Sequence, residues 1–91
     1  MSIFSIYKYK LECPGETTVE MPLYAQALTA QLQGGDLYVW VRCSTVAPTT
    51  PRKFSVIGTG RDADFDGQDF KYIATVQESD RCVWHVFEVG R

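Results

Sequence analysis

Apolar and polar residues alternate along most of this chain, with the two-residue period of β-strands rather than the longer period of helices. The clearest example is the segment 25–44, AQALTAQLQGGDLYVWVRCS, which is interrupted by Gly34-Gly35. Two adjacent glycines supply the positive φ angles that a two-residue hairpin turn requires. The segment therefore predicts a β-hairpin in which Gln33 faces Asp36.

This turn determines which side chains of the hairpin share a face, because successive residues of a strand point to opposite sides. One face is then apolar and contains the pairs Leu32–Leu37, Ala30–Val39 and Leu28–Val41. The other face contains the pairs Gln31–Tyr38, Thr29–Trp40 and Ala27–Arg42. The segment 24–33 also has apolar residues near helical spacing, but a Gly-Gly turn followed by a strongly alternating segment favours the hairpin.

A second hairpin is predicted from the segments 70–77 and 82–89, which flank the polar residues 78–81. If Gln77 faces Cys82, one face contains the pairs Val76–Val83, Ala74–His85 and Tyr72–Phe87. The reverse face contains the pairs Thr75–Trp84, Ile73–Val86 and Lys71–Glu88. The last of these would be a cross-strand charge pair.

Three more strands are predicted at 3–11, 17–21 and 53–58, where β-branched and aromatic residues are frequent. The strand at 17–21 stops at Pro22, which favours a place at the edge of a sheet. We predict a loop at 45–52, because Pro48 and Pro51 have no N–H to donate to a strand ladder. Together the strands predict a single domain over residues 1–91. We expect an all-β fold, a small antiparallel sandwich or barrel of about seven strands with little or no helix.

The composition narrows the possible functions. Hydrophobic residues make up 45% of the 91 residues, which is enough for a core, and the formal net charge is −2. A protein that binds nucleic acid non-specifically is normally basic, so we expect no direct nucleic-acid contact. No segment approaches the roughly 20 apolar residues of a membrane span, and the first residues lack the apolar run of a signal peptide. The three cysteines form no C-x-x-C motif, so reduced thiols and a cytoplasmic location are expected.

The sequence contains no residue pattern of an enzyme active site. The single histidine, His85, lies inside a predicted strand, and Cys82 three residues earlier points to the opposite face. No serine lies in a G-x-S-x-G motif, and Gly58-Thr59-Gly60 is too short for a phosphate-binding loop. We therefore predict a protein that is not an enzyme and that needs no cofactor.

The predicted loop at 59–69 is rich in aspartate. Asp62, Asp64, Asp66 and Gly67 match the D-x-D-x-D-G opening of calcium-binding loops. The glutamate that closes such a loop at its twelfth position is replaced here by Ile73. We therefore predict a solvated acidic loop without a metal. If a cation did bind, its ligands would be Asp62, Asp64 and Asp66.

By elimination, the candidate site is a binding surface. Tyr38, Trp40 and Arg42 share the face of the first hairpin opposite its apolar face, and these residue types are enriched at interface hot spots. The alternative is that a second sheet covers this face. Loops often contain the residues that recognise a partner, so charged residues of the predicted loop 59–69 are included among the candidates. The predicted binding residues are Tyr38, Trp40, Arg42, Arg61, Asp62, Asp64 and Asp66.

Several short motifs resemble those of a family of small bacteriophage and prophage proteins that form an all-β domain of unknown function. These motifs are Met21-Pro22, Ala30-Gln31-Leu32-Gln33, Trp40, Gly58-Thr59-Gly60 and His85-Val86-Phe87-Glu88. The resemblance implies a phage origin and a compact β fold, and it implies no activity. The sequence departs from the family pattern at Tyr24, where relatives usually have glycine, and in the aspartate run, which is not part of the pattern.

The leading hypothesis is a non-catalytic phage accessory protein that binds and inhibits a host protein in the host cytoplasm, for example a CRISPR effector. The acidic net charge suits a partner whose surface is basic because it normally holds nucleic acid. A different hypothesis is a module that sequesters a small molecule such as a nucleotide in a pocket joining an aromatic side chain to a cation. Its candidate residues are Tyr38, Trp40, Trp84, Arg42, Lys53 and Arg61. A third hypothesis is a minor virion component. With any of these functions, the protein could form a homodimer through an exposed edge strand such as 17–21.

Overall fold

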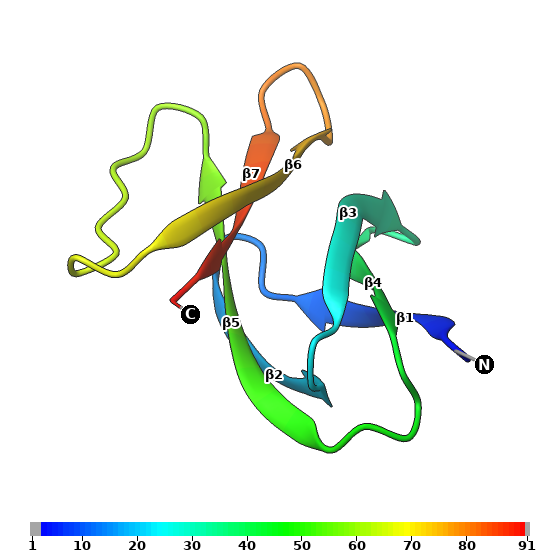
Figure 1. Cartoon of the computed structure of the whole chain (residues 1–91). Coiled ribbons are helices and arrows are strands. Elements are labelled where there is room, and N and C mark those ends of the chain that lie inside the picture. Colours follow the sequence, from blue (N-terminus) through cyan, green and yellow to red (C-terminus); the bar gives the residue numbers. More distant parts are fainter. Residues whose placement is uncertain (1–2, 91) are drawn as a thin grey trace.

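The computed structural model describes residues 3–90, which form seven β-strands and no helix (Figure 1). The strands are β1 (Ser5–Leu11), β2 (Gly15–Pro22), β3 (Gln26–Gln33), β4 (Asp36–Cys43), β5 (Thr49–Gly58), β6 (Phe70–Gln77) and β7 (Val83–Val89). This part of the chain accordingly has no helix that is long and apolar enough to cross a membrane.

The strands form two antiparallel sheets that pack against each other. Sheet A has the strand order β1-β4-β3, and sheet B has the order β2-β5-β7-β6. β3 contacts β6 and β1 contacts β2 where the sheets meet, but no ladder of hydrogen bonds joins the sheets within residues 3–90. The predicted all-β fold of about seven strands is confirmed. Of the two architectures left open, the structure is a sandwich and not a closed barrel.

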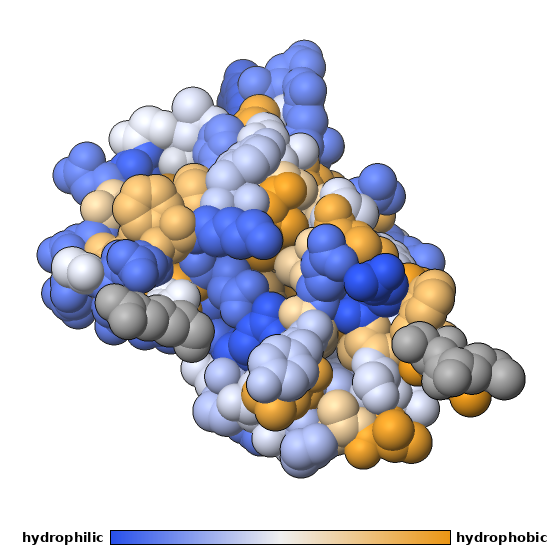
Figure 2. Space-filling view, viewed as in Figure 1, coloured by the Kyte–Doolittle hydropathy of each residue, from blue (hydrophilic) through white to orange (hydrophobic). Residues whose placement is uncertain are grey.

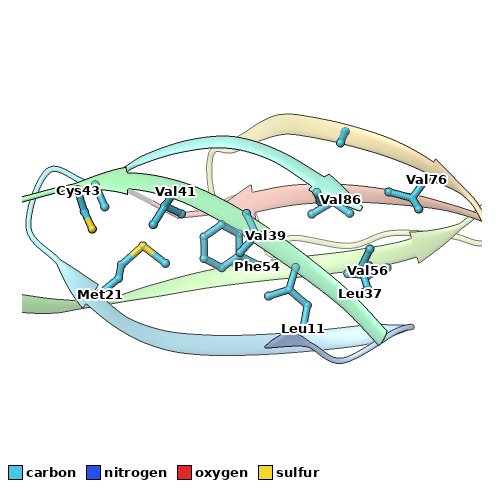
Figure 3. Close-up of a cluster of buried hydrophobic side chains, with 13 residues drawn as sticks. Leu11, Met21, Leu37, Val39, Val41, Cys43, Phe54, Val56, Val76 and Val86 are labelled. Atoms are coloured by element: carbon cyan, nitrogen blue, oxygen red, sulfur yellow. The ribbon is translucent and has the colours of Figure 1, made fainter. Parts of the chain in front are cut away.

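The core lies between the inner faces of the two sheets (Figure 3). β4 contributes Leu37, Val39 and Val41 from sheet A, and these residues alternate with outward-facing ones. Phe54 of β5 and Val86 of β7 come from sheet B, and both are fully buried. The alternation predicted for the first hairpin is therefore the pattern that builds this side of the sandwich.

The first hairpin forms around the predicted turn. The predicted pairs are confirmed for Gln33–Asp36, Leu32–Leu37, Gln31–Tyr38, Ala30–Val39 and Thr29–Trp40. A β-bulge at Leu28 then shifts the register by one residue. The predicted pairs Leu28–Val41 and Ala27–Arg42 are wrong, because Ala27 faces Val41 and Gln26 faces Arg42. The bulge leaves Leu28 46% exposed instead of placing it in the core.

The second hairpin has a longer turn than predicted. Gln77 faces Val83 rather than Cys82, because Cys82 belongs to the turn and its carbonyl accepts hydrogen bonds from the N–H groups of Glu78 and Ser79. The predicted pairs Val76–Val83, Thr75–Trp84, Ala74–His85 and Ile73–Val86 are therefore wrong. The observed pairs are Val76–Trp84, Thr75–His85 and Ala74–Val86. A bulge at position 73 then restores the predicted pairs Tyr72–Phe87 and Lys71–Glu88.

β5 begins at Thr49, so the second half of the predicted loop 45–52 belongs to a strand. Pro51 lies inside this strand, opposite Glu20 of β2. The loop prediction is wrong here because this part of β5 has a partner strand on one side only, and the pairing with β7 starts at Lys53. A residue without an N–H is tolerated where no second strand needs the donor. β2 itself lies at the edge of sheet B, as predicted.

Candidate functional site

Tyr38, Trp40 and Arg42 lie on the outer face of sheet A. The register places the residues between them in the core, so these three side chains point away from sheet B. Tyr38 and Trp40 are half-buried by their neighbours and Arg42 is exposed. Of the two arrangements considered for these residues, exposure is the one observed, and the second sheet does not cover them.

β1 brings cations to the same face. Its outward residues Ile6, Lys8 and Lys10 pair in register with Arg42, Trp40 and Tyr38 respectively. We call these six residues the sheet A face. The sequence did not predict that Ile6, Lys8 and Lys10 lie beside the residues of β4, because the pairing of β1 with β4 joins segments that lie far apart in the chain.

The side chains of the sheet A face contact one another. The ammonium of Lys8 lies 4.5 Å from the centre of the Tyr38 ring and also donates a hydrogen bond to Gln33 of β3. The Tyr38 and Trp40 rings meet edge to face, with centroids 5.9 Å apart. The guanidinium carbon of Arg42 lies 5.4 Å from the centre of the Phe4 ring. These cation–π and aromatic contacts hold the face in a defined shape.

The charge of this face differs from the charge of the chain as a whole. Lys8, Lys10 and Arg42 are positive, whereas Asp36 is the single carboxylate among the outward positions of β1, β3 and β4. Asp36 lies 3.5 Å from Lys10, and both side chains are well exposed. The sheet A face is therefore cationic, although the chain carries a net charge of −2.

An apolar hollow of about 450 Å³ adjoins the sheet A face and shares Arg42 with it. Its apolar lining consists of Ile3, Phe4, Leu23, Tyr24 and Ala47. Figure 2 shows hydrophobic side chains gathered at the lower right of the molecule, over the loop between β4 and β5. Tyr24 is 90% exposed and has a φ of 66°, a left-handed conformation that suits glycine better than tyrosine. A strained and exposed aromatic residue is a feature typical of functional sites.

The acidic loop lies elsewhere. It connects β5 to β6 of sheet B, and Figure 1 shows it at the left of the molecule, with sheet A at the right. Arg61, Asp62, Asp64 and Asp66 are all exposed. The Asp64 carboxylate accepts a hydrogen bond from the N–H of Asp66 at 2.8 Å, so it is engaged by its own loop. No group of three metal-ligating side chains occurs among residues 3–90. The two sets of predicted binding residues therefore do not form one site.

Phe65 anchors the acidic loop to the outer face of sheet B. Its ring lies 5.0 Å from the Phe70 ring and 5.8 Å from the Phe87 ring, centroid to centroid. Tyr72 extends this cluster, with its ring 5.9 Å from that of Phe87. The sequence did not predict this cluster. The available signal was Phe65, a single aromatic residue among the aspartates of the loop.

His85 has two hydroxyl partners that the sequence did not reveal. The Thr59 hydroxyl lies 2.6 Å from Nε2 and the Thr75 hydroxyl 3.2 Å from Nδ1. The Tyr72 hydroxyl in turn lies 2.8 Å from that of Thr75. Thr75 faces His85 only in the observed register, so the one-residue error in the predicted hairpin concealed this contact.

The Thr59 hydroxyl beside the His85 imidazole resembles the nucleophile and base of a hydrolytic site. Such a site also needs free N–H donors to stabilise an oxyanion, and the nearby backbone N–H groups already have acceptors. The N–H of Thr59 donates to Val83 and the N–H of Arg61 donates to Gly58. Neither is free to stabilise an oxyanion. We therefore interpret the hydroxyl–imidazole network as a set of contacts that orders the outer face of sheet B.

The comparisons with known proteins add a family and no activity. No curated protein and no solved structure matches the chain significantly. One family model matches residues 4–91, which is nearly the whole chain. The chain belongs to the family described as a domain of unknown function, DUF7352.

Proposed function

We propose that this protein is not an enzyme and acts by binding a protein partner through the sheet A face and the adjoining apolar hollow. The observation that carries the proposal is the row of Tyr38, Trp40 and Arg42 on β4. This strand is the central one of sheet A, so its outward side chains stand on a rigid support. Aromatic residues and arginine in such a position are typical of interface hot spots.

The charge of the face indicates the chemistry of the partner. Lys8, Lys10 and Arg42 suit a segment that presents carboxylates, and the hollow beside Arg42 suits an apolar side chain next to them. The net charge of the chain suggested a partner with a basic surface instead. Such a surface would have to meet the acidic loop, because the local charge of the sheet A face is positive.

The setting of the proposal is a bacteriophage, with a host protein as the target in the host cytoplasm. The support for this setting is the resemblance of the short motifs. A defence protein such as a CRISPR effector stays the example, and it would have to present an acidic segment to the cationic sheet A face. Inhibition would follow if the bound segment is one that the host protein needs for its own contacts. A homodimer through the open edge of β2, or a place in the virion, stays a prediction.

The test is affinity capture of host proteins by the wild-type chain and by two variants. Trp40→Ala combined with Arg42→Glu removes an anchor and reverses a charge on the sheet A face. Lys71→Glu is the matched control, because Lys71 is an exposed cation on sheet B. We expect one host protein to be retained by the wild type and the control and lost by the double variant. With that protein purified, the double variant should raise Kd by about tenfold or more.

Two results would contradict the proposal. One is that no host protein is retained by the wild-type chain. The other is that the double variant retains the same protein as strongly as the control. Thermal unfolding of each variant shows whether a lost interaction reflects a lost contact or a lost fold, since Trp40 and Arg42 lie outside the core.

A further inference from the structure

A second hollow, of about 280 Å³, lies where β5 ends and β7 begins. It is lined by residues of the loops that follow β5 and β6 and by Pro14 of the turn between β1 and β2. Its lining includes Gly58, Thr59, Arg61, Arg81, Cys82 and Trp84. It belongs to sheet B and shares no residue with the sheet A face.

Two arginines line this hollow without a counter-charge. Arg61 comes from the β5–β6 loop and Arg81 from the β6–β7 turn, so the fold brings them to one place from separate segments. Neither guanidinium forms an ion pair with any residue that the structure describes. No carboxylate is among the lining residues, although the chain has more acidic than basic residues. The hollow is therefore a local site of positive charge.

Trp84 forms an apolar wall of the hollow, and its position is fixed. The indole Nε1 donates a 2.8 Å hydrogen bond to the Glu78 carboxylate. The ring lies over the backbone of Gly58, where an added Cβ would approach ring atom Cζ3 to 3.3 Å. Gly58 faces Trp84 in the register of β5 and β7. The glycine at position 58 thus leaves room for the indole. The Glu78 carboxylate accepts the hydrogen bond of this indole and is not among the residues that line the hollow.

Guanidinium groups bind phosphate through paired N–H donors, and an aromatic wall next to them suits an apolar or ring-shaped group. The volume is near the lower end of the range for small-molecule sites, so it suits a single phosphorylated ring compound. We propose that this hollow binds the phosphate monoester of a small ring compound, such as a nucleoside monophosphate or a sugar phosphate. Arg61 and Arg81 hold the phosphate, and Trp84 contacts the ring.

The experiment is an NMR titration of the ¹⁵N-labelled protein with four probes: adenosine monophosphate, ribose 5-phosphate, inorganic phosphate and adenosine. We expect saturable shifts at residues 58–61 and 81–84 with at least one of the two monoesters, about tenfold tighter than with inorganic phosphate. Adenosine should not saturate the site. A preference for adenosine monophosphate would identify the nucleotide as the ligand, and a preference for ribose 5-phosphate the sugar phosphate. Equal affinity for inorganic phosphate, or no saturable shift, would overturn the proposal.

Variants test the roles of the two arginines. Arg61→Gln and Arg81→Gln should each weaken binding of the preferred monoester about tenfold, because each removes one charged fork. Both side chains are exposed, so neither change should prevent folding. Lys71→Gln is the matched control, because Lys71 is an exposed cation of β6 that does not line the hollow, and this variant should bind as the wild type does. Wild-type affinity in both loop variants would refute the assignment. Because this site lies apart from the sheet A face, the result does not depend on that of the partner-capture test.

Discussion

Arg52 of β5 and Glu88 of β7 form an ion pair in which Nε and Nη2 of the guanidinium donate to the two oxygens of the carboxylate. The Nη2–Oε1 distance is 3.0 Å, and the two side chains are only 16% and 15% exposed. Glu88 faces Phe54 in register, so the pair lies on the core side of sheet B. Lys71, the partner predicted from the sequence, also faces Glu88 in register, but both carboxylate oxygens are bound by Arg52.

Breaking this pair from one side is expected to destabilise the protein. Glu88→Gln leaves a largely buried guanidinium without its counter-charge, and we expect the free energy of unfolding to fall by about 2 kcal/mol. Replacing both partners, as in Arg52→Met with Glu88→Leu, should cost less than the single change, because no unpaired charge remains. Urea denaturation measures these differences. A Glu88→Gln variant as stable as the wild type would show that the pair adds nothing to stability.

Phe54 is the largest of the fully buried side chains and is expected to be the most sensitive position of the core. Phe54→Ala removes the ring and leaves a cavity, which typically costs about 3–5 kcal/mol. Domains of this kind have total stabilities of about 5–15 kcal/mol, so the thermal midpoint should fall sharply. Phe70→Ala is the control: this side chain is 60% exposed and contacts the Phe65 and Phe87 rings at the surface, so its removal should cost about 1–2 kcal/mol, clearly less than that of Phe54. Similar midpoints for the two variants would mean that the core is not centred on Phe54.

The parts of the fold that were predictable are those decided by local periodicity. The alternation along β4 leaves two choices for its inner face, and only one of them is apolar, so Leu37, Val39 and Val41 could be assigned to the core. The bulges at Leu28 and Ile73 could not be found in this way. Neither residue is a glycine or another local bulge signal, and the extra residue is accommodated by packing between strands.

The candidate sites show the same limit. Tyr38, Trp40 and Arg42 share a face by alternation alone, and this was predicted. The cations that β1 adds to the sheet A face depend on contacts between segments that are distant in the chain. So does the presence of Arg61, Arg81 and Trp84 in the lining of one hollow. Such contacts follow from the order of strands in the sheets, and one sequence does not determine that order.

Tyr24 is expected to stabilise the fold less than glycine would at this position. Its φ of 66° costs a residue with a side chain about 1 kcal/mol, and the ring is 90% exposed, so buried contacts do not offset the cost. Tyr24→Gly should raise the free energy of unfolding by about 0.5–1 kcal/mol, whereas Tyr24→Ala should leave it nearly unchanged. Chemical denaturation distinguishes the two. If the partner uses the apolar hollow, Tyr24→Gly should weaken its binding while stabilising the fold. A destabilised Tyr24→Gly variant would show that the ring makes contacts that matter.

Cys13 is expected to react slowly with alkylating reagents. It lies half-buried in the turn between β1 and β2, and burial raises the pKa of its thiol, with smaller contributions from the negative charge of Glu78 and from the neighbouring Cys82. A raised pKa means less thiolate at pH 8, and thiolate is the reactive form. Iodoacetamide should therefore modify Cys13 more slowly than it modifies free glutathione, as followed by peptide mass spectrometry over time.

Glu78→Gln separates the contribution of charge from that of burial at Cys13. The substitution removes one negative charge near the thiol, and the glutamine oxygen can still accept the hydrogen bond that Trp84 donates. Alkylation of Cys13 at pH 8 should become faster than in the wild type but stay slower than that of glutathione, because burial is the larger cause of the shift. An unchanged rate would mean that burial alone accounts for the low reactivity. A wild-type rate equal to that of glutathione would contradict the raised pKa itself.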